Sequence, residues 1–218
     1  MYATTTASKS ACPSPDDYMK SFEGADNIVV VTITGTLSGS YNSAEIAKKI
    51  YIEEHPDTKI HVIDSLSAGG EVDLLVRKLN HLVAEGLEFD QVLDAITAYQ
   101  AKTKLLFVLA KVDNLVKNGR LSKLVGTVVG LLNIRMVGEA SKTGTLELLQ
   151  KARGQKKAIK AALDELIKAG YTGGHITIAH RNNDKFIEQF SELVREKFAQ
   201  ASIEVLPTSG LCSFYAEE

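Results

Sequence analysis

The residues whose side chains are best suited to bind a ligand form a short hydroxyl-rich segment that follows an apolar run. The run covers residues 28–33, and threonine, serine and glycine then alternate, with hydroxyls on Thr34, Thr36, Ser38 and Ser40. Hydroxyl groups donate hydrogen bonds, and glycines such as Gly35 and Gly39 let backbone N–H groups approach a ligand closely. A loop of this kind between a strand and a helix is a frequent anion site in α/β proteins. We therefore expect residues 34–40 to hold the acidic head of a ligand.

A simpler interpretation of this loop is an ordinary strand-to-helix turn in which one serine caps the helix. The loop has neither the G-x-G-x-x-G pattern of a dinucleotide site nor the Gly-Lys-Ser/Thr of a P-loop. Upstream, Ser14 before Pro15 is typical of a helix N-cap followed by proline at the first helical position. Ser10 precedes that cap in a segment with no helix of its own to stabilise, so it remains a candidate ligand.

Groups for catalysis are sparse in this sequence. Catalysis needs a nucleophile with a base, a metal or paired carboxylates, yet the sequence contains no G-x-S-x-G, H-E-x-x-H or Cys-x-x-Cys motif. His180 ends a predicted strand, and a single histidine without a visible triad is more often structural. A hydrolase or acyl transferase that uses the hydroxyl-rich loop with His180 as its base stays open as the alternative function.

Arg120 lies in the sequence N-G-R-L-S and is a candidate contact for a partner. Arginine holds carboxylates or phosphates through two parallel hydrogen bonds, although a solvated loop cation is the simpler interpretation. Residues 119–133 also permit a helix-turn-helix and hence a transcriptional regulator. Their apolar character argues against DNA binding, and a core helix or the lining of an apolar tunnel explains the same pattern.

The composition narrows the class of protein. The 218 residues carry 25 basic and 27 acidic side chains, which give a net charge of -2 and no bulk field for nucleic acid. Two distant cysteines form no disulfide framework or zinc spacing and suit a reducing compartment. No apolar run is long enough to span a membrane. We expect a cytoplasmic protein without a cofactor, a metal, a nucleic-acid partner or an integral membrane segment.

The elements predict an α/β fold of two domains. Residues 28–33 and 59–63 read as buried strands, each followed by an amphipathic helix, which favours a parallel Rossmann-like sheet. The first of these helices should end near Glu54, with Asn42 and Glu45 closing a capping box. Later strands include a hairpin around residues 142–144, typical of a mostly antiparallel α/β sandwich. We place the domains at residues 1–95 and 96–218, with the loops for a carboxylate in the first and the cover of an apolar tail in the second.

Several segments, taken in order, resemble the DegV family of bacterial fatty-acid-binding proteins. They are S-x-x-P-S-P, V-T-I-T-G-T-L-S-G-S-Y-N-S-A, V-I-D-S, N-G-R-L-S-K and L-L-N-I, and they cover nearly the whole chain in one collinear order. Family members that resemble this sequence serve as the lipid-carrying subunit of fatty acid kinase. The resemblance implies a long-chain fatty acid held between two α/β domains, and it implies no chemistry by this protein itself.

The resemblance also implies which residues bind. The fatty-acid carboxylate would be held by hydroxyls and N–H groups from two loops, matched here by Ser10, Thr34, Gly35, Ser38 and Gly39. Arg120 matches the arginine loop of the family and would meet the kinase, which phosphorylates the bound carboxylate. The long acyl tail would dominate affinity, at about 0.8 kcal/mol per buried methylene.

The sequence departs from the family pattern in a few places. Ala11 replaces a serine, and Gly35 stands where a second serine is common, so two donors are missing. The opening strand of the family and its closing His-x-Gly-Pro-Gly pattern have no match. We therefore expect a fragment with an exposed sheet edge that another chain covers.

Overall fold

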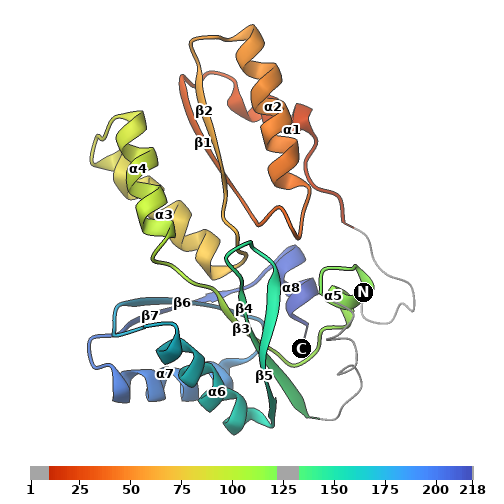
Figure 1. Ribbon diagram of the computed structural model, residues 1–218, viewed down its shortest axis with the longest axis vertical. Coiled ribbons are helices and arrows are strands. Elements are labelled where there is room, and N and C mark those ends of the chain that lie inside the picture. The colour runs from red at the N-terminus through yellow and green to blue at the C-terminus, as the bar shows by residue number, and fades with distance from the viewer. Residues whose placement is uncertain (1–9, 122–132, 218) are drawn as a thin grey trace. The chain divides into compact units, whose positions relative to one another are not determined.

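A computed structural model of the protein describes residues 10–121 and 133–217, and its elements fall into two units (Figure 1). The first unit contains Ser10–Thr103 together with Lys142–Thr145, and the second contains Lys104–Ser141 and Leu146–Glu218. The chain thus passes from one unit to the other just after the fourth helix, whereas the sequence placed this boundary at residues 95 and 96. Residues 122–132, which include most of the segment considered for DNA binding or for a tunnel, lie outside the described residues.

The first unit is built on two parallel strands. Strand β1 (Asn27–Thr32) pairs with β2 (Lys59–Asp64), in a register that runs from Asn27 opposite Lys59 to Thr32 opposite Asp64. Both strands are rich in valine and isoleucine, which fit a pleated and covered surface. The parallel pairing predicted from the sequence is therefore confirmed, and it brings the carboxyl ends of β1 and β2 to the same edge.

Helices pack against the apolar residues of both faces of this two-stranded sheet. Residues Ile28 and Val30 pack with the cluster of α1 (Pro15–Phe22) and α2 (Ser40–Glu54). The alternate residues Val29 and Val31 pack with the cluster of α3 (Gly70–Ala84) and α4 (Phe89–Gln100). This alternation explains why the first strand is an unbroken apolar run, because successive side chains point to opposite, covered faces.

The helix starts follow partly from the sequence. Ser14 caps α1 in a capping box with Asp17, and Pro15 is the first helical residue, so the predicted cap is confirmed. Helix α2 ends at Glu54 as expected, but it begins at Ser40 with Gly39 as its N-cap and no side-chain cap. The predicted capping box of Asn42 and Glu45 is therefore wrong. The serine-glycine loop already forms a helical turn there, so the N-cap lies three residues upstream, at Gly39 instead of Asn42.

The second unit joins antiparallel and parallel pairs of strands. Strands β3 (Leu106–Leu109), β4 (Ile134–Ala140) and β5 (Leu146–Arg153) form an antiparallel sheet. Strands β6 (His175–His180) and β7 (Ser202–Pro207) form a separate parallel pair. The predicted α/β class, with a parallel sheet followed by a mainly antiparallel one, is confirmed, and the parallel pairing of β6 with β7 is an addition to it.

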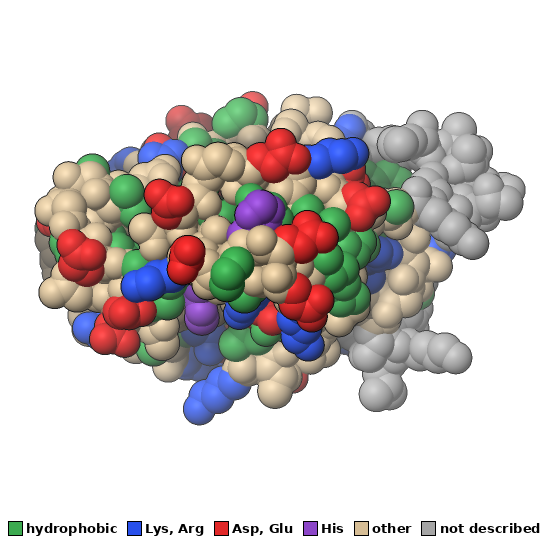
Figure 2. All heavy atoms as spheres, turned by 90° about the horizontal axis from the view of Figure 1, so that it is seen from above, with side chains coloured by type: hydrophobic (Ala, Val, Ile, Leu, Met, Phe, Trp, Pro, Cys, Tyr) green, Lys and Arg blue, Asp and Glu red, His purple; other side chains and the backbone are tan. Residues whose placement is uncertain are grey.

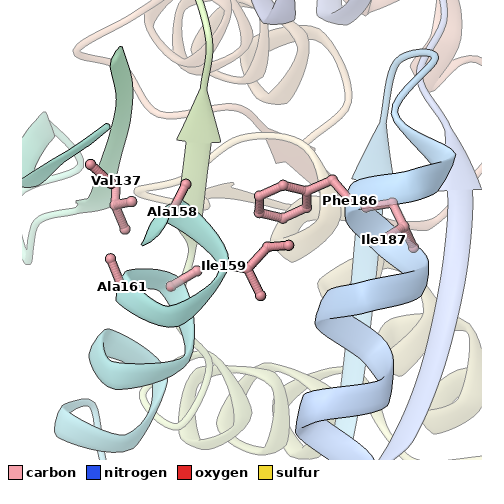
Figure 3. Packing of buried hydrophobic residues seen from close by; sticks show 8 residues of the cluster. Val137, Ala158, Ile159, Ala161, Phe186 and Ile187 are labelled. Carbon is pink, nitrogen blue, oxygen red and sulfur yellow. The ribbon is translucent and has the colours of Figure 1, made fainter. Parts of the chain in front are cut away.

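Helices complete the second unit and supply its core. They are α5 (Asp113–Lys117), α6 (Gln155–Lys168), α7 (Asp184–Lys197) and α8 (Gly210–Ala216). In Figure 3, Val137 of β4 and Ala158 of α6 lie on one side of the cluster, while the ring of Phe186 on α7 points toward Ile159 of α6. Small alanines on α6 let that helix lie close to the sheet.

Candidate functional site

The hydroxyl-rich segment forms a loop between β1 and α2, and Thr34 anchors it. Thr34 is fully buried, with 0% of its surface exposed. Its backbone N–H donates to the carbonyl of Ser67 (2.8 Å), and its carbonyl accepts from the N–H groups of Leu37 and Ser38 (3.1 and 3.3 Å). The loop therefore connects the carboxyl ends of two neighbouring strands, which is where α/β proteins place ligands.

The two threonine hydroxyls of the loop are used inside the protein. The hydroxyl of Thr36 donates to the carbonyl of Gly144 at 2.6 Å, so its single hydrogen is spent. In the contact of 3.2 Å between the two threonine hydroxyls, Thr34 must then be the donor. Thr34 thus has no hydroxyl hydrogen left for a carboxylate in this arrangement, and its contribution is to shape the loop.

The serine hydroxyls of the loop leave one hydrogen available. Ser38 Oγ lies 2.9 Å from Ser40 Oγ, so one of these two hydroxyls donates to the other. Burial raises the pKa of the Tyr18 phenol, more than its interaction with the Ser40 side chain lowers it, so the phenol keeps its proton at neutral pH. The two serine hydroxyls carry two hydrogens but make only one bond with each other. A negative group beside Ser38 would draw the remaining hydrogen to that end.

A carboxylate from the second strand fixes the start of the loop. Asp64 ends β2, and its side chain accepts from the N–H of Gly35 (3.1 Å to Oδ2) and from the N–H of Leu66 (2.9 Å to Oδ1). A Cβ atom on residue 35 would lie 3.1 Å from Asp64 Oδ2, closer than most such contacts. Gly35 therefore permits a close approach and spends its own N–H on Asp64 rather than on a ligand.

A four-residue turn from later in the chain also packs on the loop. Residues Lys142–Thr145 belong to the first unit, and Gly144 has a positive φ of 78°. A Cβ atom at Gly144 would lie only 2.1 Å from Thr34 Oγ1 and 3.0 Å from the Cα of Leu66. Glycine is thus required at this position for both its backbone conformation and its contact with the loop.

The segment that precedes α1 lies against the start of α2. The Ser43 hydroxyl donates to the carbonyl of Pro13 at 2.7 Å, and a Cβ atom at Gly39 would lie 3.1 Å from the sulfur of Cys12. Gly39 therefore makes room for the segment that precedes α1. Ser10 is exposed at the beginning of this segment.

Three contributors to this site were not identified as such from the sequence. Tyr18 reads as an ordinary residue of an amphipathic helix, and Gly144 reads only as a hairpin signal. Asp64 follows the predicted strand at residues 59–63 without any motif of its own, and its partners are backbone N–H groups. For Gly144, the only local signal in the sequence was a glycine after Lys142-Thr143. That signal predicts a turn but does not show which loop the turn contacts.

Arg120 lies three residues after α5 in the second unit, and it is partly buried. Its N–H donates to the carbonyl of Leu115 at 2.8 Å, and its guanidinium lies 5.1 Å from the centre of the Tyr215 ring. Such a cation–π contact restrains the side chain. Arg120 is therefore held in place more firmly than a solvated cation.

His180 makes local contacts within the second unit. The Asn183 N–H lies 3.3 Å from His180 Nδ1, and Nε2 lies 3.8 Å from a carboxylate oxygen of Asp184. The histidine borders a surface pocket of about 440 Å³ at the carboxyl ends of β6 and β7, lined by His180, Arg181, Asn182, Asp184, Pro207, Thr208 and Ser213. Both ring nitrogens thus face groups at the start of α7, which favours a structural role for His180 over that of a base.

The described residues are characterised by their distribution of charge, the length of their helices and the grouping of possible metal ligands. Acidic and basic side chains are interspersed on the face shown in Figure 2, and neither sign forms a continuous area there. Among residues 10–121 and 133–217, no helix is long and apolar enough to cross a membrane. In the same residues, no group of three or more histidine, cysteine or acidic side chains is arranged to hold a metal ion.

Fold and site together define an α/β protein of two units with a hydroxyl-lined loop at the carboxyl ends of a parallel strand pair. The chain matches a family model described as "Uncharacterised protein, DegV family" over residues 1–218. The protein belongs to the DegV family, and the family predicted from its motifs is confirmed.

Relatives in streptococci are close in sequence. A DegV domain-containing protein of Streptococcus pneumoniae is 77% identical over 218 residues, which are 100% of this chain and 78% of the relative. A DegV domain-containing protein of Streptococcus gordonii is 75% identical over the same span. This chain therefore corresponds to about four-fifths of the length of these relatives.

Solved structures of similar proteins contain fatty acids. The Streptococcus pneumoniae Fatty Acid Kinase (Fak) B3 protein loaded with linoleic acid is 77% identical, with a TM-score of 0.96, and the match covers 100% of this chain and 78% of that one. A DegV family protein of Eubacterium eligens loaded with heptadecanoic acid is 38% identical, with a TM-score of 0.93, and the match covers 99% and 78% of the two chains.

Proposed function

We propose that this protein binds a long-chain fatty acid and holds its carboxylate at the loop between β1 and α2. The observation that carries the proposal is the similarity, over the whole chain, to a Fak B3 protein loaded with linoleic acid. The loop supports it independently, because it combines an available serine hydrogen with glycine backbone at the end of a strand.

The donors for the carboxylate come from the exposed side of the loop. We assign them to Ser38, to the N–H of Gly39 and to Ser10, while Thr34 and Gly35 shape the loop through their internal bonds. A buried carboxylate without such donors would be prohibitively costly to desolvate. Two backbone N–H groups already compensate the charge of Asp64 nearby, which lowers its repulsion of a second anion.

The head group and the tail have different roles in this proposal. Each buried methylene contributes about 0.8 kcal/mol, so a long acyl tail supplies most of the affinity. The hydrogen bonds at Ser38 fix which end of the fatty acid reaches the loop. A carboxyl group presented in this way is available to a second protein.

We infer that the second protein is a fatty acid kinase and that this chain is a carrier rather than the catalyst. The similarity to a protein named for fatty acid kinase supports the partner, and the local contacts of His180 argue against a base on this chain. Arg120, held over Tyr215, is the proposed contact for the kinase. We place this role in the cytoplasm, where the exposed thiols of Cys12 and Cys212 stay reduced.

Native mass spectrometry of the purified protein tests whether it carries a fatty acid. We expect an added mass equal to that of a long-chain fatty acid, and release of that mass under denaturing conditions. A protein without any such adduct, which also fails to take up added oleic acid, would contradict the proposal.

A substitution pair tests the head-group assignment. Ser38→Ala removes a hydrogen bond to a charged group, about 1.5–3 kcal/mol, and should weaken fatty-acid binding about 10- to 100-fold. Ser21→Ala is the matched control, because the Ser21 hydroxyl bonds the carbonyl of Asp17 on the exposed side of α1. Equal affinities of the two variants in a fluorescent fatty-acid displacement assay would rule out Ser38 as a ligand.

A further inference from the structure

A serine hydroxyl on the second strand's loop is buried and has no partner among the described residues. Ser67 follows β2, only 1% of its surface is exposed, and its Oγ makes no hydrogen bond within residues 10–121 and 133–217. Buried hydroxyls are nearly always bonded, and an unbonded one needs an explanation. A ligand group that satisfies the hydroxyl when bound is such an explanation.

The backbone of Ser67 is fixed next to the loop between β1 and α2. Its carbonyl accepts from the N–H of Thr34 at 2.8 Å, and its own N–H donates to the Ser65 hydroxyl at 3.1 Å. The Ser65 hydroxyl in turn donates to the carbonyl of Ser67 at 3.1 Å. Both backbone groups of Ser67 are therefore satisfied, in contrast to its side-chain hydroxyl.

Ser67 and Ser38 are connected through one residue. Thr34 donates its N–H to Ser67 and accepts the N–H of Ser38, so both serines lie beside the same fully buried threonine. They come from the carboxyl ends of the two paired strands, β2 and β1. A carboxylate has two oxygens and can accept from two separate donors.

We propose that the Ser67 hydroxyl donates to the head group of the bound fatty acid, as a second hydroxyl ligand beside Ser38. This inference rests on the proposed fatty-acid binding. The site then has one hydroxyl donor from each strand end, and the Ser67 hydroxyl gains its partner when the fatty acid binds. Ser67 is thus a binding residue that no sequence motif distinguished from the cap of a helix.

The test uses Ser67→Ala, which should raise the stability of the delipidated protein and lower its affinity for a fatty acid. Ser67→Ala removes a buried unbonded hydroxyl, so the delipidated protein should gain about 2–4 °C in Tm. The same substitution should weaken binding of hexadecanoic acid by about 10-fold or more, because a bond to a charged group is lost. Binding is measured by displacement of a fluorescent fatty acid from the full chain.

A second buried serine provides a matched control. Ser191 on α7 is 5% exposed, and its hydroxyl also has no partner in the part of the chain that the structure describes. Ser191→Ala should therefore raise Tm in the same way but leave the affinity for hexadecanoic acid unchanged. Hexadecan-1-ol serves as the second ligand, since Ser67→Ala should weaken its binding less than that of the acid.

The possible results separate this inference from the function on which it rests. If wild type binds hexadecanoic acid and Ser67→Ala binds it equally well, the ligand role of Ser67 is overturned and fatty-acid binding stands. A lower Tm of delipidated Ser67→Ala would show that the hydroxyl has a protein partner, which also overturns the role. Failure of wild type to bind either ligand would overturn both proposals.

Discussion

Replacement of Gly144 by alanine tests whether the turn Lys142–Thr145 fixes the loop between β1 and α2. Gly144 has a φ of 78°, and an alanine Cβ there would lie 2.1 Å from Thr34 Oγ1. The left-handed conformation costs about 1–2 kcal/mol for a residue with a Cβ. The clash also forces the turn away from the loop, which breaks the bond from the Thr36 hydroxyl to the Gly144 carbonyl, worth about 0.5–1.5 kcal/mol.

The free energy of unfolding should therefore fall by about 2–3 kcal/mol in Gly144→Ala. Gly86→Ala is the matched control, because Gly86 has a φ of 74° but a Cβ atom there would meet none of the described atoms within 4 Å. That variant should lose only the conformational part, about 1–2 kcal/mol. Urea denaturation followed by circular dichroism measures both values.

Fatty-acid affinity separates the two glycine variants further. Displacement of Thr34 would disturb the loop that positions Ser38, so Gly144→Ala should bind a long-chain fatty acid more weakly than wild type, whereas Gly86→Ala should bind it normally. Equal destabilisation of the two variants, together with equal affinities, would refute the role of the turn.

Two further predictions concern the partner contact and the acid stability of the first unit. Arg120→Ala should slow phosphorylation of the bound fatty acid by a fatty acid kinase with ATP, measured as acyl-phosphate formed, while fatty-acid affinity stays unchanged; an unaltered rate would remove Arg120 from the kinase contact. Hydrogen bonds from the Ser14 side chain, then from its backbone N–H, lower the pKa of Asp17 below 3.8. The stabilisation from Asp17 is therefore present above that pH and is lost as pH falls through the lowered value. The Tm difference between wild type and Asp17→Asn should shrink over this range, and a constant difference would contradict the assignment.

Local features of the fold were predictable from the sequence because they depend on neighbouring residues. The apolar run of β1 predicted a strand covered on both faces, and Ser14 with Pro15 predicted the start of α1. The start of α2 was not predicted correctly. Asn42 offered a side-chain cap, but the loop before it already turns into a helix at Ser40.

The chemistry of the site depends on contacts between residues far apart in the chain. Residues 36 and 144 meet across 108 positions, and Gly35 meets Asp64 across 29. A run of hydroxyls in the sequence shows that hydrogen-bond donors exist. Only the contacts between distant residues determine which of these hydrogens already form bonds within the protein. Thr34 and Gly35 use their hydrogens within the protein, so Ser38 is the better candidate for a carboxylate ligand. Ser67 is a further candidate that the sequence did not distinguish.

The most direct test of the central claim is a crystal structure of this protein with a long-chain fatty acid bound. We predict a carboxylate oxygen within about 2.5–3.0 Å of Ser38 Oγ, at the end of the chain that meets the loop between β1 and α2. A fatty acid bound with its carboxylate away from this loop, while Ser38 and Ser40 remain bonded only to protein groups, would contradict the account.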